Sequence, residues 1–171
     1  MDISYRNDKV NMDQYIIKRG SGDDLDLIKP LWEKLNQLHF DLSPHFKHRF
    51  HGMTWDNRKS KLLEKSRDIM LDYAIDNNDE KIIGYCISTI DKEDSKTGEI
   101  DSIYIDYNYR KSGLGKQLME RAIQWLQSSN TETQKLLVAF GNEEVFGFYK
   151  QFDFYPLHIV LQRKKDDLNN P

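Results

Sequence analysis

The sequence has little cysteine, no long apolar run and no strong excess of one charge. Its single cysteine, Cys86, excludes an internal disulfide and a cysteine-based zinc knuckle. No stretch approaches the roughly 18 apolar residues of a membrane span, and residues 1–20 lack the apolar core of a secretion signal. We therefore expect a cytoplasmic protein in a reducing compartment, with no membrane partner.

The overall charge gives no support to nucleic-acid binding. Lys and Arg number 25 and Asp and Glu number 28, for a net charge of −3. The distribution is uneven, however. Residues 68–106 contain eleven acidic residues against three lysines, and residues 45–65 contain six basic residues against two acidic ones. Two opposed patches are therefore expected.

What the sequence does contain is enough apolar material for a globular domain. Hydrophobic residues make up 38% of the 171 residues and aromatic residues 12%, which argues against disorder. No repeat and no interdomain linker is visible. We expect one domain over residues 1–171, with a charged and frayed tail at 163–171.

The first third predicts a strand at 15–18, a helix around 25–38 and a polar helix at 55–65, with a less regular segment between the helices. Residues 20–24 supply a turn, a helix cap and acidic first-turn residues. Pro30 lies inside the helical pattern, so this helix is expected to kink or to consist of two abutting pieces.

The remainder predicts an α+β arrangement. Strands at 68–76, 81–91 and 99–106 are joined by loops too short for parallel crossovers, so they form an antiparallel meander. A helix from Gly113, a strand at 135–140, a helix at 143–151 and a last strand at 157–162 follow. Strand, glycine turn, helix and strand together make a βαβ unit.

The glycine turn between the meander and the long helix is the most informative segment. Its glycines allow close backbone approach, and a helix N-terminus exposes unpaired N–H groups with partial positive charge. The seven residues are Arg110, Lys111, Ser112, Gly113, Leu114, Gly115 and Lys116. With three cations, they form an anion site suited to a phosphate or pyrophosphate.

Two common phosphate-binding patterns fail here on required residues. A Walker loop needs Gly where Arg110 stands and Ser or Thr where Gln117 stands. A dinucleotide fingerprint needs a third glycine at Leu118. What remains is the pattern R-x-x-G-x-G, for which an ordinary glycine turn that caps a helix is the alternative.

With this pattern the sequence resembles the GNAT superfamily of N-acetyltransferases. A second motif, from Asn142 to Tyr149, looks like the family's Asn-led helix that ends in a Tyr. The resemblance covers residues 15–162 in element order, with its motif core at 97–155. It implies a mixed, mostly antiparallel twisted sheet of six to seven strands. This sheet would splay between its fourth and fifth strands and be flanked by about four helices.

Three positions depart from the family's pattern. Tyr107 stands where the family often has Pro, Lys111 where it often has Gly, and Asp153 where a Gly precedes the Phe. Asp tolerates the left-handed backbone conformation better than most residues, so Asp153 need not disrupt that turn.

The resemblance implies acetyl-CoA as co-substrate and no metal. The pantetheine arm would pair with the backbone of Ile103, Tyr104 and Ile105, and the pyrophosphate would lie on the amides of the glycine turn. A backbone N–H near Ile105 would stabilise the oxyanion that forms when an amine attacks. Asn142 and Tyr149 would complete the cofactor site.

The resemblance also suggests an acid and a base for direct transfer in a ternary complex. Tyr149 would protonate the departing thiolate. Glu99 matches a position where some members carry a general base, and Asp101 lies one step further on the same strand face. Which carboxylate, or a water, accepts the amine proton stays open. His45, His48 and His51 do not fit a zinc signature.

The acceptor and the assembly state stay open as well. A primary amine of a small molecule or peptide is expected: the acidic patch favours a cationic amine, and the basic segment favours one with a carboxylate. A non-catalytic acyl-CoA sensor of the same fold is the alternative function. The last strand, 157–162, could form an edge that pairs two copies into a homodimer.

Overall fold

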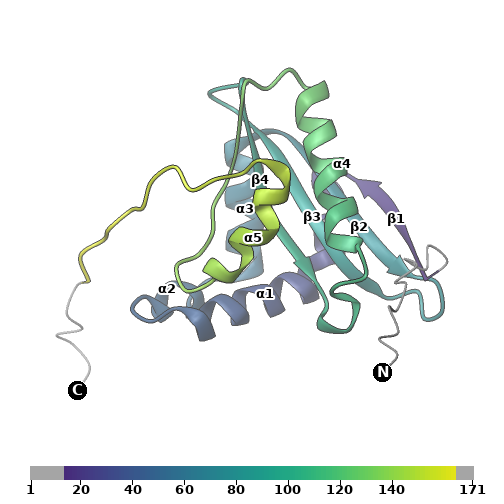
Figure 1. Cartoon of the computed structure of the whole chain (residues 1–171), viewed down its shortest axis with the longest axis horizontal. Coiled ribbons are helices and arrows are strands. Elements are labelled where there is room, and N and C mark those ends of the chain that lie inside the picture. The colour runs from purple at the N-terminus through teal and green to yellow at the C-terminus, as the bar shows by residue number, and fades with distance from the viewer. Residues whose placement is uncertain (1–13, 165–171) are drawn as a thin grey trace, which may run out of the picture.

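The computed structural model describes residues 14–164, and its centre is a five-stranded sheet in the order β1-β2-β3-β4-β5 (Figure 1). The first four strands pair antiparallel and β5 pairs parallel to β4. The strands are β1 (Tyr15–Gly20), β2 (Ser66–Asp76), β3 (Ile82–Asp91), β4 (Thr97–Ile105) and β5 (Thr133–Leu136). The predicted meander is therefore confirmed as β2, β3 and β4.

A bulge in β4 changes which side chains share a face. Ile87 pairs with Ser102 and Ser88 pairs with Ile100, so Asp101 is an extra residue in the ladder. Glu99 and Asp101 both contact Lys65, and the Ser102 hydroxyl lies 3.3 Å from that of Tyr85. The bulge thus adds a third polar side chain to the β4 face that carries both carboxylates.

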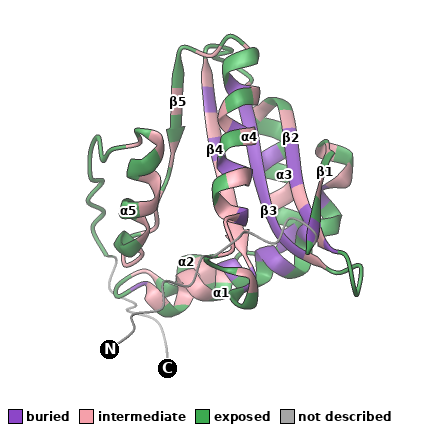
Figure 2. Ribbon diagram, turned by 45° about the vertical axis from the view of Figure 1, so that its right-hand side comes forward, coloured by how far each residue is buried: buried purple, intermediate pink, exposed green. Residues whose placement is uncertain are grey.

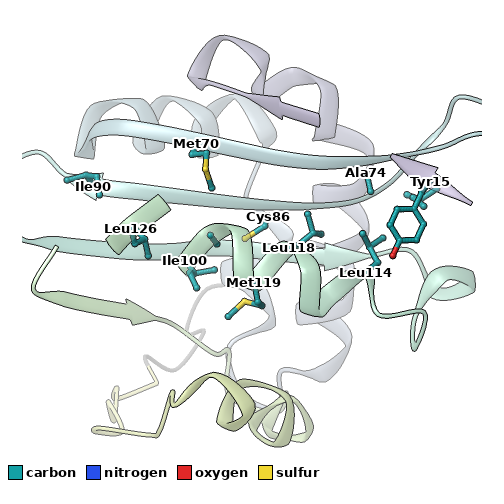
Figure 3. Packing of buried hydrophobic residues seen from close by; sticks show 12 residues of the cluster. Tyr15, Met70, Ala74, Cys86, Ile90, Ile100, Leu114, Leu118, Met119 and Leu126 are labelled. Carbon is teal, nitrogen blue, oxygen red and sulfur yellow. The ribbon is translucent and has the colours of Figure 1, made fainter. Parts of the chain in front are cut away.

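Helices cover both faces of the sheet. One face is covered by α1 (Lys29–Leu42) and α3 (Trp55–Lys65), with the short α2 (Lys47–His51) between them in the chain. The other is covered by α4 (Leu114–Ser128) and α5 (Phe146–Tyr149). Alternating strand residues explain the two layers, because Met70 and Ala74 pack under α4 whereas Leu71 packs under α1 and α3. Figure 3 shows the α4 layer around Cys86, Leu118 and Met119.

The N-terminal helical region confirms two abutting pieces. A 3₁₀ segment, Gly22–Ile28, begins with a capping box in which Ser21 and Asp24 satisfy each other's backbone N–H groups. The α-helix α1 then begins at Lys29 with Pro30 in its first turn, where a missing N–H costs no intrahelical bond. The pattern break at Pro30 is therefore a change of helix type.

The predicted count of six to seven strands is wrong for the described residues, which form five. Residues 157–162 form no strand and lie exposed at the surface. Within this segment Gln162 accepts a hydrogen bond from Arg49. The strand expected at 135–140 is β5, Thr133–Leu136, because its pairing with β4 ends at Leu136. Five α-helices, rather than about four, occur in this part of the chain.

Within residues 14–164 no helix combines the length and apolarity that crossing a membrane requires. The predicted frayed tail falls mostly outside the described residues, which end at Lys164.

Candidate active site

The strands β4 and β5 separate halfway along β4, and we call the unpaired edge that this leaves on β4 the slot. Their parallel ladder runs from the pair Thr97–Thr133 to the pair Ile100–Leu136 and stops there. Past Ile100, β4 continues to Ile105 with β3 as its ladder partner on one side. The backbone on the other side faces the gap between β4 and the chain that leads to α5 (Figure 2). The residues at the slot are Ile103, Tyr104 and Ile105.

At the end of β4 the glycine turn presents a helix N-terminus without a side-chain cap. Gly113 is the N-cap of α4 at φ +85°, a conformation that favours glycine. Helical bonding begins with the N–H of Gln117, which donates to the Gly113 carbonyl at 3.1 Å. The N–H groups of Gly115 and Lys116 in the first turn therefore have no intrahelical acceptor. The Ser112 hydroxyl instead shapes the turn, because it donates to the Tyr109 carbonyl at 2.6 Å.

Cations surround this N-terminus. The Arg110 guanidinium donates to the Ile105 carbonyl at 3.2 Å and lies 5.6 Å from the ring centroid of Tyr104 and 5.7 Å from that of Tyr107. Lys116 lies 3.7 Å from Glu120 in an exposed i,i+4 pair, which is worth little in solution. The turn therefore combines free amides with positive charge, as an anion site requires.

Two turns have another residue where the GNAT pattern often has glycine, and their backbone conformation explains that preference. Lys111 has φ +61° and Asp153 has φ +61°, both in the left-handed region. The chain adopts the same conformation without glycine, at a cost of about 1 kcal/mol for a residue with a Cβ. The expectation for Asp153 is confirmed.

The helix α5 lies beside the glycine turn. A Cβ on Gly115 would lie 3.4 Å from the Phe148 ring and 3.9 Å from Ile105, so the end of β4, the start of α4 and α5 meet at one point. Tyr149 packs against the core next to Phe148. Burial raises the pKa of Tyr149 to about 12, so its phenol stays protonated at neutral pH. Asn142 lies one residue before the 3₁₀ turn Glu143–Val145 that leads into α5.

The two candidate carboxylates lie on the opposite face of β4 and are held by cations from α3. Asp101, whose side chain is 1% exposed, pairs with Arg58 through one oxygen and with Lys65 through the other, at 2.8 Å. Glu99 has a looser contact, 3.7 Å from the Lys65 ammonium to one oxygen, and its side chain is 16% exposed. A small cavity of about 10 Å³ adjoins Glu99, Lys65 and Lys135, close to the volume that one water needs.

Sequence reasoning missed the cations that hold these carboxylates. Arg58 and Lys65 lie seven residues apart on α3, so they share a helix face, but only the fold brings that face to β4. Lys34 of α1 was missed in the same way. It donates to Asp106 at 2.6 Å, and this contact lowers the pKa of the carboxyl and raises that of the lysine. Spacing on α3 was the one available signal.

No cluster of three His, Cys, Asp or Glu residues suited to a metal ion occurs among residues 14–164.

Comparison with known proteins assigns the family. A family model described as the acetyltransferase (GNAT) family matches residues 32–154. The chain belongs to the GNAT family of acetyltransferases.

Solved structures share this fold at low sequence identity. An acetyltransferase of Trypanosoma brucei has a TM-score of 0.61 at 17% identity, over 87% of this chain and 98% of that one. An aminoglycoside acetyltransferase from an uncultured soil metagenomic sample has a TM-score of 0.60 at 18% identity, over 89% and 95%. The aminoglycoside N-acetyltransferase AAC(6')-Iy, in complex with CoA, has a TM-score of 0.62 at 15% identity, over 89% and 95%.

Proposed function

We propose that this protein is an acetyl-CoA-dependent N-acetyltransferase that moves the acetyl group to a primary amine by direct attack within a ternary complex. The observation that carries the proposal is the meeting of three features. The splayed half of β4, the start of α4 and the helix α5, which carries the partly buried Tyr149, meet around Gly115. A solved relative of the same fold holds CoA.

The residues at the slot supply unpaired backbone groups and positive charge, which suit CoA. The backbone of Ile103, Tyr104 and Ile105 would pair with the pantetheine arm, because that edge of β4 has no β5 partner. The pyrophosphate would accept from the amides of the glycine turn, where Arg110, Lys111 and Lys116 add charge. Arg110 can do so while it holds the Ile105 carbonyl, because that bond uses only Nε of its five N–H donors. Asn142, at the entry to α5, would contact the cofactor from the other arm.

The acyl thioester supplies an activated carbonyl. The side chains accept a proton from the amine and donate one to the departing sulfur. We assign proton acceptance to Glu99, through a water, since one of its oxygens forms no ion pair or hydrogen bond within residues 14–164 and a water-sized cavity adjoins it. Both oxygens of Asp101 are held by cations, so Asp101 positions α3 against β4. The Tyr149 phenol, protonated through neutral pH, would donate to the departing sulfur.

The wider setting is proposed on the same basis. The acceptor is a small molecule or a peptide with a primary amine, and the protein acts in the cytoplasm. Residues 1–171 act as a single domain. We also propose a homodimer in which a second copy covers the exposed apolar side chains of residues 157–161.

A thiol-release assay tests the function. Purified protein, acetyl-CoA and a panel of primary amines should release CoA well above the rate without amine, and mass spectrometry should find the acetylated amine. Cys86 will not disturb a thiol reagent, because burial raises its pKa to about 12 and encloses it fully. Acetyl-CoA binding without release on any amine would instead support the non-catalytic sensor.

A further inference from the structure

The acidic excess of residues 68–106 does not form an acidic face. Asp72 lies under α4, where it pairs with Arg19 and Arg121. Asp76, Asp79, Asp91 and Asp94 accept from backbone N–H groups of their own turns. On the α1 and α3 side the acids named above each have a cation, namely Lys34, Arg58 or Lys65. The excess of negative charge is therefore neutralised locally on the face that carries Glu99.

The helix α1 bridges the two arms of the splayed sheet. Lys34, in its first half, holds Asp106 just after β4. Its last turn lies against the chain beyond β5, where a Cβ on Gly141 would overlap the Leu42 carbonyl oxygen. Figure 2 shows α1 and α2 beneath the separated ends of β4 and the β5–α5 arm. The helix α2 therefore lies on the α1 side of the sheet, below the open end of the slot (Figure 2).

The helix α2 brings cations without carboxylate partners to this end. Its anchor is the Asn36 amide, which donates to the Phe50 carbonyl at 2.9 Å. Among residues 14–164, Lys47 and Arg49 have no ion pair. The Lys47 ammonium lies 5.2 Å from the Phe40 ring centroid, and Arg49 donates to the side-chain oxygen of Gln162 at 3.2 Å. That bond aims Arg49 at the segment that follows α5.

Asp41, the acid of α1 nearest to α2 in the sequence, is engaged within its own helix. Asp41 of α1 accepts from Gln37 at 2.9 Å. Two histidines of α2, His48 and His51, pack against Phe46 and Phe40. The Arg49 guanidinium is held by a neutral amide and the Lys47 ammonium by an aromatic ring. Because neither is paired with an acid, both positive charges are available to an anionic ligand.

We propose that the acceptor amine carries a carboxylate, and that Arg49 with Lys47 binds this group while the amine reaches the slot. The inference rests on the proposed function and names its substrate class. It predicts that polycationic amines such as sisomicin, which a structural relative binds, are poor acceptors here. It also decides between the two acceptor classes that the charge pattern of the sequence leaves open.

Matched acceptors test the proposal directly. Glycylglycine and glycylglycinamide differ in the carboxylate alone, and sisomicin supplies the polycation. We expect kcat/KM for glycylglycine to exceed that for its amide by about tenfold. Arg49→Gln should bring this ratio close to one, Lys47→Gln should lower it, and Arg49→Glu should reverse it. Arg67→Gln removes an exposed arginine paired with Asp68 on β2 and should leave the ratio unchanged.

A binding measurement separates this inference from the proposed reaction. NMR titration of the ring protons of His48 and His51 with N-acetylglycine and N-acetylglycinamide needs no turnover. Selective shifts with the carboxylate, lost in Arg49→Gln, would support the site even if no amine releases CoA. Equal use of carboxylate and amide, equal binding of both, or a preference for sisomicin would overturn the proposal.

Discussion

Tyr149 is the one candidate catalytic residue whose protonation state the structure resolves. Burial raises its pKa to about 12 from 10.0, so the phenol remains a proton donor as pH rises through 7 to 10. Tyr149→Phe should lower kcat about 100-fold and change the dissociation constant of acetyl-CoA less than about threefold, since the substitution removes one hydroxyl. Deprotonation of Tyr149 should therefore not lower the turnover of the wild-type protein below about pH 11. An equal loss of binding and turnover would assign Tyr149 to packing.

Glu99 and Asp101 lie two residues apart but should respond differently to substitution. Glu99→Gln should lower kcat/KM about 100-fold and keep stability within about 0.5 kcal/mol. Asp101→Asn leaves Arg58 and Lys65 facing a neutral amide and should destabilise the fold by about 1–3 kcal/mol, less than a fully buried pair because both cations are partly exposed. Urea unfolding and steady-state kinetics distinguish the two. An unchanged kcat/KM for Glu99→Gln would exclude Glu99 as the base.

At this scale the local geometry of the glycine turn was predictable from the sequence, because motif residues carry that geometry with them. The spacing around Gly113 is sufficient to predict a helix start, and its φ of +85° follows from the absence of a side chain. The partners of Glu99 and Asp101 were not predictable, since Arg58 and Lys65 reach them from 34 or more residues away. An ion pair across the fold leaves no periodic signal.

Among the elements, the contact between α1 and the loop after β5 depends on one glycine. Gly141 has φ +98°, and a Cβ there would overlap the Leu42 carbonyl oxygen. Gly141→Ala should therefore destabilise the protein by about 2 kcal/mol or more and lower activity, because the two arms of the slot lose their common support. Thermal unfolding measures the loss.

The matched control is Gly147 in α5, where a Cβ would meet nothing within 4 Å. Gly147→Ala should leave stability unchanged or raise it by up to about 1 kcal/mol, since alanine favours the helix. If the two alanine variants unfold at the same temperature, the close approach at Gly141 does not hold the arms together.

The boundaries of helices and strands agree with the sequence-based predictions wherever a local signal, such as a helix cap, marks them. The helix expected at 55–65 is Trp55–Lys65, with Thr54 as its cap. The end of β5 was predicted too late, because Leu137 and Phe140 continue the apolar pattern although both are exposed, at 82% and 66%. An apolar run indicates an extended chain, but pairing into a sheet also needs a neighbouring strand. Beyond Leu136 the chain has separated from β4, so the strand ends there.

For the molecule as a whole, the exposed C-terminal segment is the feature that monomer packing does not explain. Leu157, Ile159, Val160 and Leu161 are each at least 77% exposed. Leu157, Ile159 and Leu161 alternate as in a strand, and the extension of β5 at Leu137 and Phe140 is likewise exposed and unpaired in the ladder. Monomers rarely expose a contiguous apolar surface of this kind. Both surfaces belong to one chain, so a two-fold symmetric pair can cover them reciprocally.

The full chain should therefore sediment as a dimer at micromolar concentration. Replacing Ile159 and Leu161 by Glu should shift it to monomer, because each charge would lie in the covered surface. Leu27→Glu is the matched control, at a 46% exposed leucine in the 3₁₀ segment before α1, and should leave the mass unchanged. Light scattering after size exclusion gives the mass directly. A monomer at every concentration up to about 100 μM would contradict the dimer, since an apolar interface of standard size binds more tightly than that.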